Sequence, residues 1–235
     1  MNPILIALDV DRADAAIALA DRLRGAVGGY KIGMQLFTSA GPDIVRHFVA
    51  NGDRVFLDLK FHDIPNTVAG AVAAAAELGV WMCNVHGSGG RAMLAAARRG
   101  ADEGARRSGR PAPLVIAVTV LTSLSAEDLH EVGVAGSPEQ QVVSLAKLAA
   151  EAGLDGVVAS PQEIGALRAA CGPDFTIVTP GIRGGSAAAA ADDQSRTSTP
   201  AGAMAAGSTY LVIGRPITAA PDPRAAAEKI IAELA

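Results

Sequence analysis

The sequence alternates short apolar segments with helical segments, and this alternation constrains the fold more strongly than any other feature. Apolar, often β-branched runs predict strands, and stretches with apolar residues three and four positions apart predict helices. The expected strands are residues 4–8, 28–33, 54–61, 81–86, 114–120, 156–160, 175–179 and 210–213. The expected helices are residues 11–24, 41–51, 65–78, 91–107, a short helix from 125, 139–152, 161–171, a helix from 200, and 222–234.

A strand followed by a helix, repeated along a chain, places the strands parallel in one sheet that the helices cover. Eight such units in 235 residues most simply close into a (β/α)8 TIM barrel, an α/β fold. We therefore expect a single barrel domain that spans residues 1–235. The alternative is an open doubly wound sheet, but no GxGxxG motif follows the first expected strand.

Charged residues concentrate at the end of the third expected strand. Residues 54–61 alternate so that Asp58 and Lys60 share one face, and Asp63 follows where the strand ends. Side chains two positions apart on a strand are about 6 to 7 Å apart at the backbone, so the tips of Asp58 and Lys60 can meet. Because a buried, unpaired charge is costly, we expect a partly buried network of opposite charges. A surface salt bridge on a half-exposed strand is the alternative.

Polar residues also end most of the other expected strands. The active site of a TIM barrel lies at the carboxyl ends of its strands. The residues delivered to that end are Asp9, Lys31, Asp58, Lys60, His86, Thr122, Pro180, Arg183, Gly214 and Arg215. The general polarity of loops would account for Ser160, but it accounts poorly for two lysines and two aspartates in a barrel mouth. We therefore expect a charged functional site there.

The cations of this end suggest two separate tasks. Lys31 and Lys60 would each have a carboxylate neighbour, so we expect both to stay protonated. Lys60 is then placed as a proton donor or a cationic stabiliser. Arg183 after the seventh strand, and Gly214 with Arg215 after the eighth, match the position at which TIM barrels commonly hold a phosphate.

Composition and motifs argue against several functional classes. A net charge of −4 with scattered Lys and Arg argues against a nucleic-acid polymer as partner. No HExxH motif or acid–histidine cluster supports a metal or other cofactor, and the isolated His62 and His86 are more often core or loop residues than ligands. Cys83 and Cys171 lie far apart, as is typical of reduced thiols. With no signal peptide and no bilayer-length apolar run, we expect a cytoplasmic protein without a membrane partner.

Six segments of the sequence together resemble one family, the orotidine 5′-phosphate decarboxylases, which catalyse the last step of UMP synthesis. The matching segments are residues 8–9 (LD), 31–33 (KIG), 58–67 (DLKFHDIPNT), 118–123 (VTVLTS), 179–183 (TPGIR) and 212–216 (VIGRP). They occur in the family's order and cover nearly the whole chain, and residues 58–67 are the most specific of them. The resemblance implies decarboxylation of orotidine 5′-phosphate to UMP and CO₂ in de novo pyrimidine synthesis, without a cofactor.

The resemblance also implies a role for each matching residue. Lys60 would donate a proton to C6 of the pyrimidine, within a charge network of Lys31, Asp58 and Asp63. Substrate contacts are implied for Asp9 and Lys31 at the ribose, Asp58 near the reacting carboxylate, Thr122 and Pro180 near the pyrimidine, and Arg183, Gln194, Gly214 and Arg215 at the phosphate. Asp63, Ile64 and Thr67 would reach the neighbouring subunit's site, so a homodimer with shared active sites is implied. Residues 187–191 fit no motif of the family.

The implied reaction makes physical demands that the charged residues could meet. Loss of CO₂ from C6 leaves an electron pair in the ring plane, which the ring carbonyl groups cannot delocalise. Fixed charge therefore has to stabilise it, and a cationic Lys60 would do so. Asp58 would press on the departing carboxylate.

Two alternative functions remain open from the sequence. A metal-dependent sugar-phosphate decarboxylase or aldolase on a related barrel shares an Asp-x-Lys-x-x-Asp pattern, but such enzymes use an acid at the second strand, where this chain has Lys31. A lysine ammonium cannot ligate Mg²⁺, which takes oxygen ligands. A non-catalytic nucleotide-phosphate binding barrel is the second alternative, and it would not need two lysines and three acids in one site.

Overall fold

The computed structural model describes residues 1–183 and 197–234, and in it eight parallel strands close into a barrel. The strands are β1 (Ile4–Ala7), β2 (Gly29–Gly33), β3 (Val55–Phe61), β4 (Met82–His86), β5 (Leu114–Val118), β6 (Gly156–Val158), β7 (Thr176–Thr179) and β8 (Tyr210–Ile213). Each strand pairs with the next one along the sequence, and β8 pairs with β1. The predicted TIM barrel is confirmed, and an open sheet is excluded.

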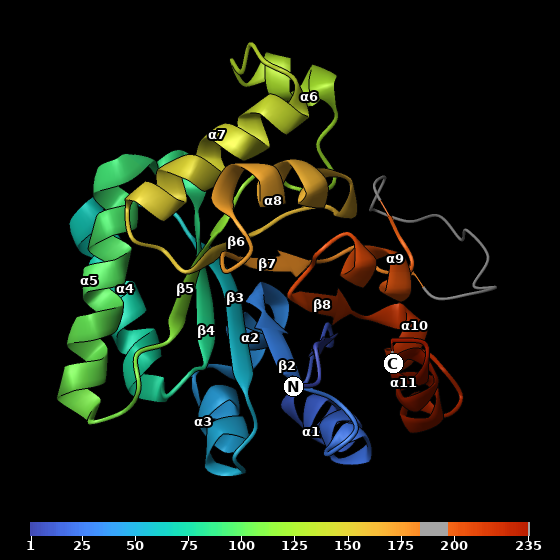
Figure 1. The fold of residues 1–235 in the computed structure, drawn as a ribbon. Coiled ribbons are helices and arrows are strands. Elements are labelled where there is room, and N and C mark those ends of the chain that lie inside the picture. Colours follow the sequence, from blue (N-terminus) through green and yellow to red (C-terminus); the bar gives the residue numbers. More distant parts are fainter. Residues whose placement is uncertain (184–196, 235) are drawn as a thin grey trace.

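Helices surround the strands (Figure 1). They are α1 (Ala13–Leu23), α2 (Met34–Ala40), α3 (Asp43–Ala50), α4 (Pro65–Leu78), α5 (Gly90–Ser108), α6 (Ala126–Glu131), α7 (Pro138–Glu151), α8 (Ile164–Cys171), α9 (Pro200–Ala205), α10 (Arg215–Thr218) and α11 (Pro223–Ala232). The sequence pattern does not reveal α2 and α10, because each is too short for an apolar period to show. Within the described residues, no helix combines the length and the apolar character that crossing a membrane requires.

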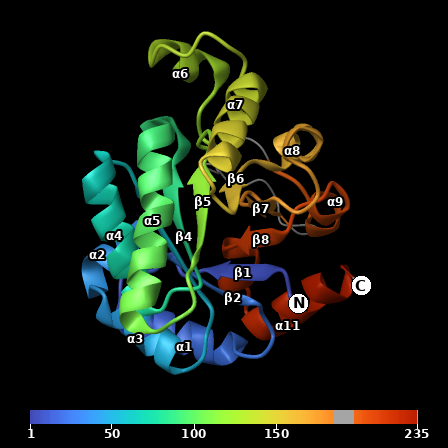
Figure 2. The same ribbon diagram turned by 60° about the vertical axis from the view of Figure 1, so that its left-hand side comes forward.

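Helix α4 is held close to α5, and this contact places the segment that follows β3. The first residue of α4 is Pro65, a position at which the missing N–H of proline has no helical partner to lose. Gly100 and Gly104 of α5 face the backbone of α4, where a Cβ on either would clash with the carbonyl oxygen of Ala69 or Ala73. The two helices consequently lie side by side, as both ribbon views show (Figures 1 and 2).

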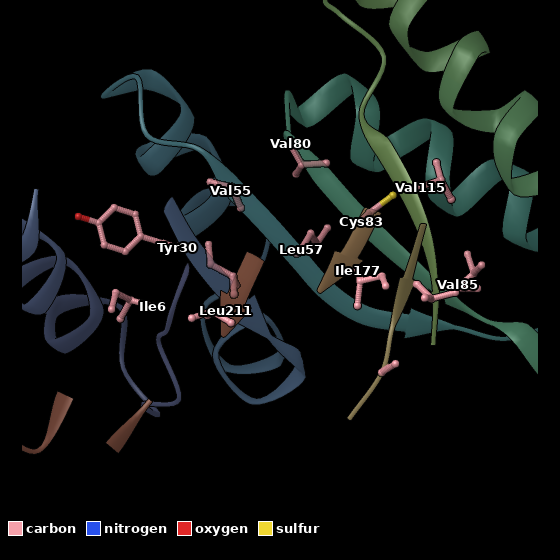
Figure 3. Packing of buried hydrophobic residues seen from close by; sticks show 14 of the residues in the cluster. Ile6, Tyr30, Val55, Leu57, Val80, Cys83, Val85, Val115, Ile177 and Leu211 are labelled. Carbon is pink, nitrogen blue, oxygen red and sulfur yellow. The ribbon is translucent and has the colours of Figure 1, made fainter. Parts of the chain in front are cut away.

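Two apolar layers cover the strands, one outside the barrel and one inside it. Figure 3 shows part of the outer layer, which packs against the helices and includes Ile6, Tyr30, Leu57, Cys83, Val85 and Val115. The inner layer consists of Leu5, Ala7, Phe56, Met82, Ile116, Val178 and Val212. Because side chains alternate along a strand, the residue two positions beyond each inner residue also points towards the barrel axis. This alternation brings the polar strand ends together.

Candidate active site

A cavity of about 580 Å³ opens at the carboxyl ends of the strands. Its volume lies in the range of roughly 300 to 1,000 Å³ that is usual for small-molecule sites. The sequence-predicted site residues that line it are Asp9, Lys31, Asp58, Lys60, Thr122, Pro180, Arg183, Gly214 and Arg215. The fold thus brings these residues, which come from six different strand ends, to one place.

Strand alternation explains why these side chains face the cavity. Phe56 belongs to the inner apolar layer, and Asp58 two residues later has the same orientation. Asp9 follows Ala7 by the same spacing, and Gly214 follows Val212. The apolar residue of each pair fills the barrel interior, and its polar or glycine partner lines the cavity above it.

Four charged side chains from β1, β2 and β3 form a single chain of ion pairs. Lys60 Nζ donates to Asp58 Oδ1 at 2.7 Å. Lys31 Nζ lies 3.6 Å from Asp58 Oδ2 and donates to Asp9 Oδ1 at 2.8 Å. Positive and negative groups alternate along this chain, so that each ammonium group has at least one carboxylate neighbour.

Asp58 is the most central member of the network, and its residue is 9% exposed. Burial by itself would raise the pKa of this carboxyl group. The charges of Lys31 and Lys60, with hydrogen bonds from Lys60 and Asn84, outweigh burial and hold the pKa of Asp58 below its ordinary value. Asp58 is therefore ionised at neutral pH and can hold both ammonium groups in place.

Lys60 has an unusual backbone conformation. Its φ is +52°, and it is the only non-glycine residue with a positive φ in the described part of the chain. A left-handed conformation of this kind costs a non-glycine residue on the order of 1 to 3 kcal/mol, so the surrounding structure has to hold it. The pairing of β3 with β4 is irregular at this point, between Leu57 and Phe61.

Asn84 on β4 contacts this strained segment, and the sequence reasoning missed it. Its Oδ1 accepts a hydrogen bond from the backbone N–H of Lys60 at 2.8 Å, and its Nδ2 donates to Asp58 Oδ1 at 2.7 Å. The sequence does carry a signal, because a polar side chain in the middle of the apolar segment 81–85 must find a partner when it is buried. Asn84 is fully buried.

The end of β7 forms the far wall of the cavity, opposite β3 in the closed order of strands. Gly181 has a φ of +76°, a conformation that glycine adopts without steric cost. Ile182 forms an isolated parallel bridge with Ser198, and the N–H of Arg183 donates to the carbonyl oxygen of Ser198 at 2.9 Å. Arg183 is thereby anchored at the cavity wall.

The end of β8 lies next to it and brings a second arginine. Gly214 is the residue before α10, and Arg215 is the first residue of that helix. Both line the cavity together with Arg183. Gln194, the remaining residue predicted for this group, lies outside the described residues.

The segment from His62 to Thr67 does not take part in this cavity. All of its residues are exposed in the single chain, and Ile64 is 67% exposed. Asp63 Oδ1 accepts the N–H of Ile64 at 2.6 Å. Within the described residues Asp63 forms no ion pair with Lys60, whose carboxylate partner is Asp58. One chain alone therefore does not bring Asp63, Ile64 or Thr67 to the site.

His62 and His86 lie beside the network and contact each other. Their ring centroids are 5.3 Å apart. Burial lowers the pKa of His86, and the neighbouring His62 and Lys60 lower it further. Among residues 1–183 and 197–234, no three His, Cys, Asp or Glu side chains are grouped so that they could hold a metal ion.

The sequence is similar to those of well-described proteins along its whole length. The family model for the orotidine 5′-phosphate decarboxylase / HUMPS family matches residues 2–230. Orotidine 5′-phosphate decarboxylase of Moorella thermoacetica is 58% identical over 234 residues, which cover 99% of this chain and 92% of that protein. The protein of the same name from Chromohalobacter salexigens is 57% identical over 234 residues, covering 100% of this chain and 96% of that protein.

Solved structures show the same similarity. The crystal structure of orotidine 5′-phosphate decarboxylase from Lactobacillus acidophilus has a TM-score of 0.89 and 40% sequence identity, and the match covers 100% of this chain and 99% of that one. An uncharacterized conserved protein from Geobacillus kaustophilus has a TM-score of 0.87 and 38% identity, with 99% of this chain and 100% of that one covered.

Proposed function

This chain belongs to the orotidine 5′-phosphate decarboxylase / HUMPS family and is a carboxy-lyase, and we propose how its charged site converts orotidine 5′-phosphate to UMP and CO₂ in de novo pyrimidine synthesis. The observation that carries the proposal is the alternating network of Asp9, Lys31, Asp58 and Lys60. It ends in an ammonium group that borders the cavity and is held by a buried carboxylate. A site of this kind can stabilise an anion with fixed charge.

The order of strands around the barrel suggests how the nucleotide lies. Arg183 and Arg215, at β7 and β8, offer planar guanidinium groups suited to phosphate oxygens. Moving around the closed barrel from β8, the next strands are β1 and β2, whose Asp9 and Lys31 would contact the ribose. The following strand, β3, carries Lys60. A nucleotide bound by its phosphate at β7 and β8 would thus place its base near Lys60.

Lys60 would act on C6 of the pyrimidine. When CO₂ leaves, the electron pair of the broken C–C bond stays at C6 in the ring plane, where it cannot delocalise into the carbonyl groups. The Lys60 ammonium stabilises this charge and then donates a proton to C6, which gives UMP and a neutral amine that solvent reprotonates. Asp58, which donates no proton, keeps the Lys60 ammonium directed at the reacting carbon.

Asp58 and the phosphate group would supply the rest of the rate enhancement. The Asp58 carboxylate lies beside the position of the departing carboxylate, and the repulsion between them is relieved when CO₂ leaves. Holding like charges together costs free energy, which binding of the remote phosphate by Arg183 and Arg215 offsets. Thr122 and Pro180 border the cavity between these groups and would contact the base.

The exposed segment after Lys60 supports a homodimer with shared sites. Ile64 is a large apolar side chain, 67% exposed, next to Asp63, and neither lines the cavity of its own chain. Docking against the mouth of a second barrel would bury Ile64 and add Asp63 and Thr67 to the partner's site. In that arrangement Asp63 becomes the second carboxylate neighbour of the partner's Lys60.

The activity is tested by the loss of orotidine 5′-phosphate absorbance with purified protein, before and after treatment with EDTA. We expect turnover that EDTA leaves unchanged. Turnover that EDTA abolishes and a divalent metal restores would instead support a metal-dependent sugar-phosphate decarboxylase or aldolase. Binding of UMP without release of CO₂ from orotidine 5′-phosphate would support a non-catalytic nucleotide-binding barrel.

The shared site is tested by mixing two inactive variants, Lys60→Ala and Asp63→Ala, after dissociation and reassociation. If Asp63 acts across the interface, each hybrid dimer contains one site that lacks both groups and one that lacks neither, so activity returns. Activity that stays at the level of the separate variants would contradict the shared site. The control is a mixture of Lys60→Ala with Asp58→Ala, where both groups come from one chain and no activity should return.

A further inference from the structure

Asn84 uses both functional groups of its side chain on β3. Its Nδ2 donates to Asp58 Oδ1 at 2.7 Å, and its Oδ1 accepts the backbone N–H of Lys60 at 2.8 Å. It is fully buried, and it is not among the residues that line the cavity. We propose that Asn84 is a positioning residue for the decarboxylation, which fixes the carboxylate of Asp58 and the left-handed backbone of Lys60 with one amide. This inference rests on the proposed function for its catalytic consequence.

The irregular pairing of β3 with β4 explains why a side chain is needed here. Leu57 pairs with Cys83, but the next paired residue on β3 is Phe61, opposite Val85. Between these pairs β3 has more residues than β4, so the backbone N–H of Lys60 bonds a side-chain oxygen in place of a strand carbonyl. The bond to Asn84 satisfies that buried donor and favours the φ of +52° that Lys60 adopts.

The bond from Asn84 to Asp58 fixes the orientation of the carboxylate. Oδ1 of Asp58 accepts from Asn84 and from Lys60 Nζ, both at 2.7 Å, while Oδ2 faces Lys31 Nζ at 3.6 Å. A neutral donor is suited to this place, because a third cation would compete with the lysines for Asp58. An amide also supplies an acceptor for the Lys60 N–H, which an ammonium or guanidinium group could not.

The test compares Asn84→Leu, Asn84→Asp and the control Ser208→Ala. Leucine has a similar size and makes neither hydrogen bond. Aspartate keeps the acceptor and can donate to Asp58 only while it holds a proton. Ser208 is a buried polar residue that contacts Thr179, Ile177 and Tyr210 and does not touch the network.

We expect Asn84→Leu to lower kcat by about 100-fold, the effect of a displacement near 1 Å in a catalytic group. KM should change less, because Asn84 does not border the cavity. Ser208→Ala should keep the kcat of the wild type. A kcat for Asn84→Leu that equals that of Ser208→Ala would overturn the proposal.

The pH dependence of Asn84→Asp separates positioning from a structural role. Asp58 faces Lys31 and Lys60, so a proton shared by the two carboxyl groups should lie on the new aspartate, and like-charge repulsion raises its pKa. The kcat of this variant relative to wild type should therefore be highest in acid and fall as pH rises. Titration of His62 and His86 affects both proteins and cancels in the ratio. A ratio that does not change with pH would contradict the proposal.

A crystal structure of Asn84→Leu tests the positioning independently of activity. We expect Lys60 to leave the left-handed region and Asp58 to rotate away from Lys60 Nζ. If φ of Lys60 stays positive and the bond between Lys60 and Asp58 is intact, the proposal is wrong even for an active enzyme. If Asn84→Leu does not fold, the same two features are examined in Asn84→Asp at high pH. Wild-type protein that does not decarboxylate orotidine 5′-phosphate would refute the proposed function, and the structural readout would still judge the role of Asn84.

Discussion

The two ends of the barrel use positive charge in different ways. At the amino ends of the strands, Arg168 of α8 donates to four backbone carbonyl oxygens around the starts of β7 and β8 and to the hydroxyl of Thr209. Arg98 of α5 donates to the carbonyl oxygen of Pro113 and to Asp155, where β5 and β6 begin. These arginines tie helices to strand starts and face no cavity substrate.

At the carboxyl ends, the cations of β2 and β3 are lysines whose printed partners are carboxylates. Lys31 contacts Asp9 and Asp58, and Lys60 contacts Asp58 at the border of the cavity. A guanidinium group has five donors in a rigid plane and suits the joining of several fixed acceptors. An ammonium group is a compact charge on a flexible stem that can also give up a proton. The comparison shows that the choice of cation follows the task of each end.

Substitution of Lys60 should have the largest effect on activity. Lys60→Ala removes both the charge beside C6 and the proton donor, so we expect kcat to fall by about 10⁴-fold, the upper range for one general acid. The affinity for UMP, measured by calorimetry, should change far less. Arg168→Met serves as the comparison from the other end of the barrel, and its kcat should match wild type. Near-normal turnover in Lys60→Ala would refute the assigned role.

Arg215→Ala should have an intermediate effect. Loss of a charged hydrogen-bonding group at the phosphate costs roughly 1.5 to 3 kcal/mol, so kcat/KM should fall by about 10 to 100-fold. Both KM and kcat should contribute, because phosphate binding offsets the repulsion at the reacting end. Steady-state kinetics measure this, with the exposed Arg106→Ala as control. An unchanged KM would contradict a phosphate contact.

Arg168→Met should affect stability and leave turnover alone. The substitution leaves several carbonyl oxygens near β7 and β8 without their donor, and we expect a loss of about 3 kcal/mol, or roughly 10 °C in Tm. Thermal unfolding followed by circular dichroism measures the change. Arg106→Met, which loses a surface pair with Glu103, should shift stability by less than about 1 kcal/mol. Equal melting temperatures for the two variants would show that the two kinds of arginine do not differ.

The sequence predicts the barrel and the orientation of its charges better than it predicts what holds them. Alternation along residues 54–61 places Asp58 and Lys60 on one face, and their side chains do meet. The role of Asn84 depends on the irregular register between β3 and β4, which no local pattern encodes. The short helix α10 has too few residues to show a period. The contacts of Asp63 depend on a second chain, and a single sequence contains no coordinates for that partner.

The central claim is that the charge network stabilises an electron pair at C6, and exchange of the C6 proton of UMP tests it most directly. By microscopic reversibility, an enzyme that stabilises this carbanion also promotes removal of the proton from its product. Incubated with UMP in D₂O and followed by proton NMR, the wild type should replace the C6 hydrogen with deuterium, and Lys60→Ala should not. Exchange that proceeds equally in both proteins would contradict the account.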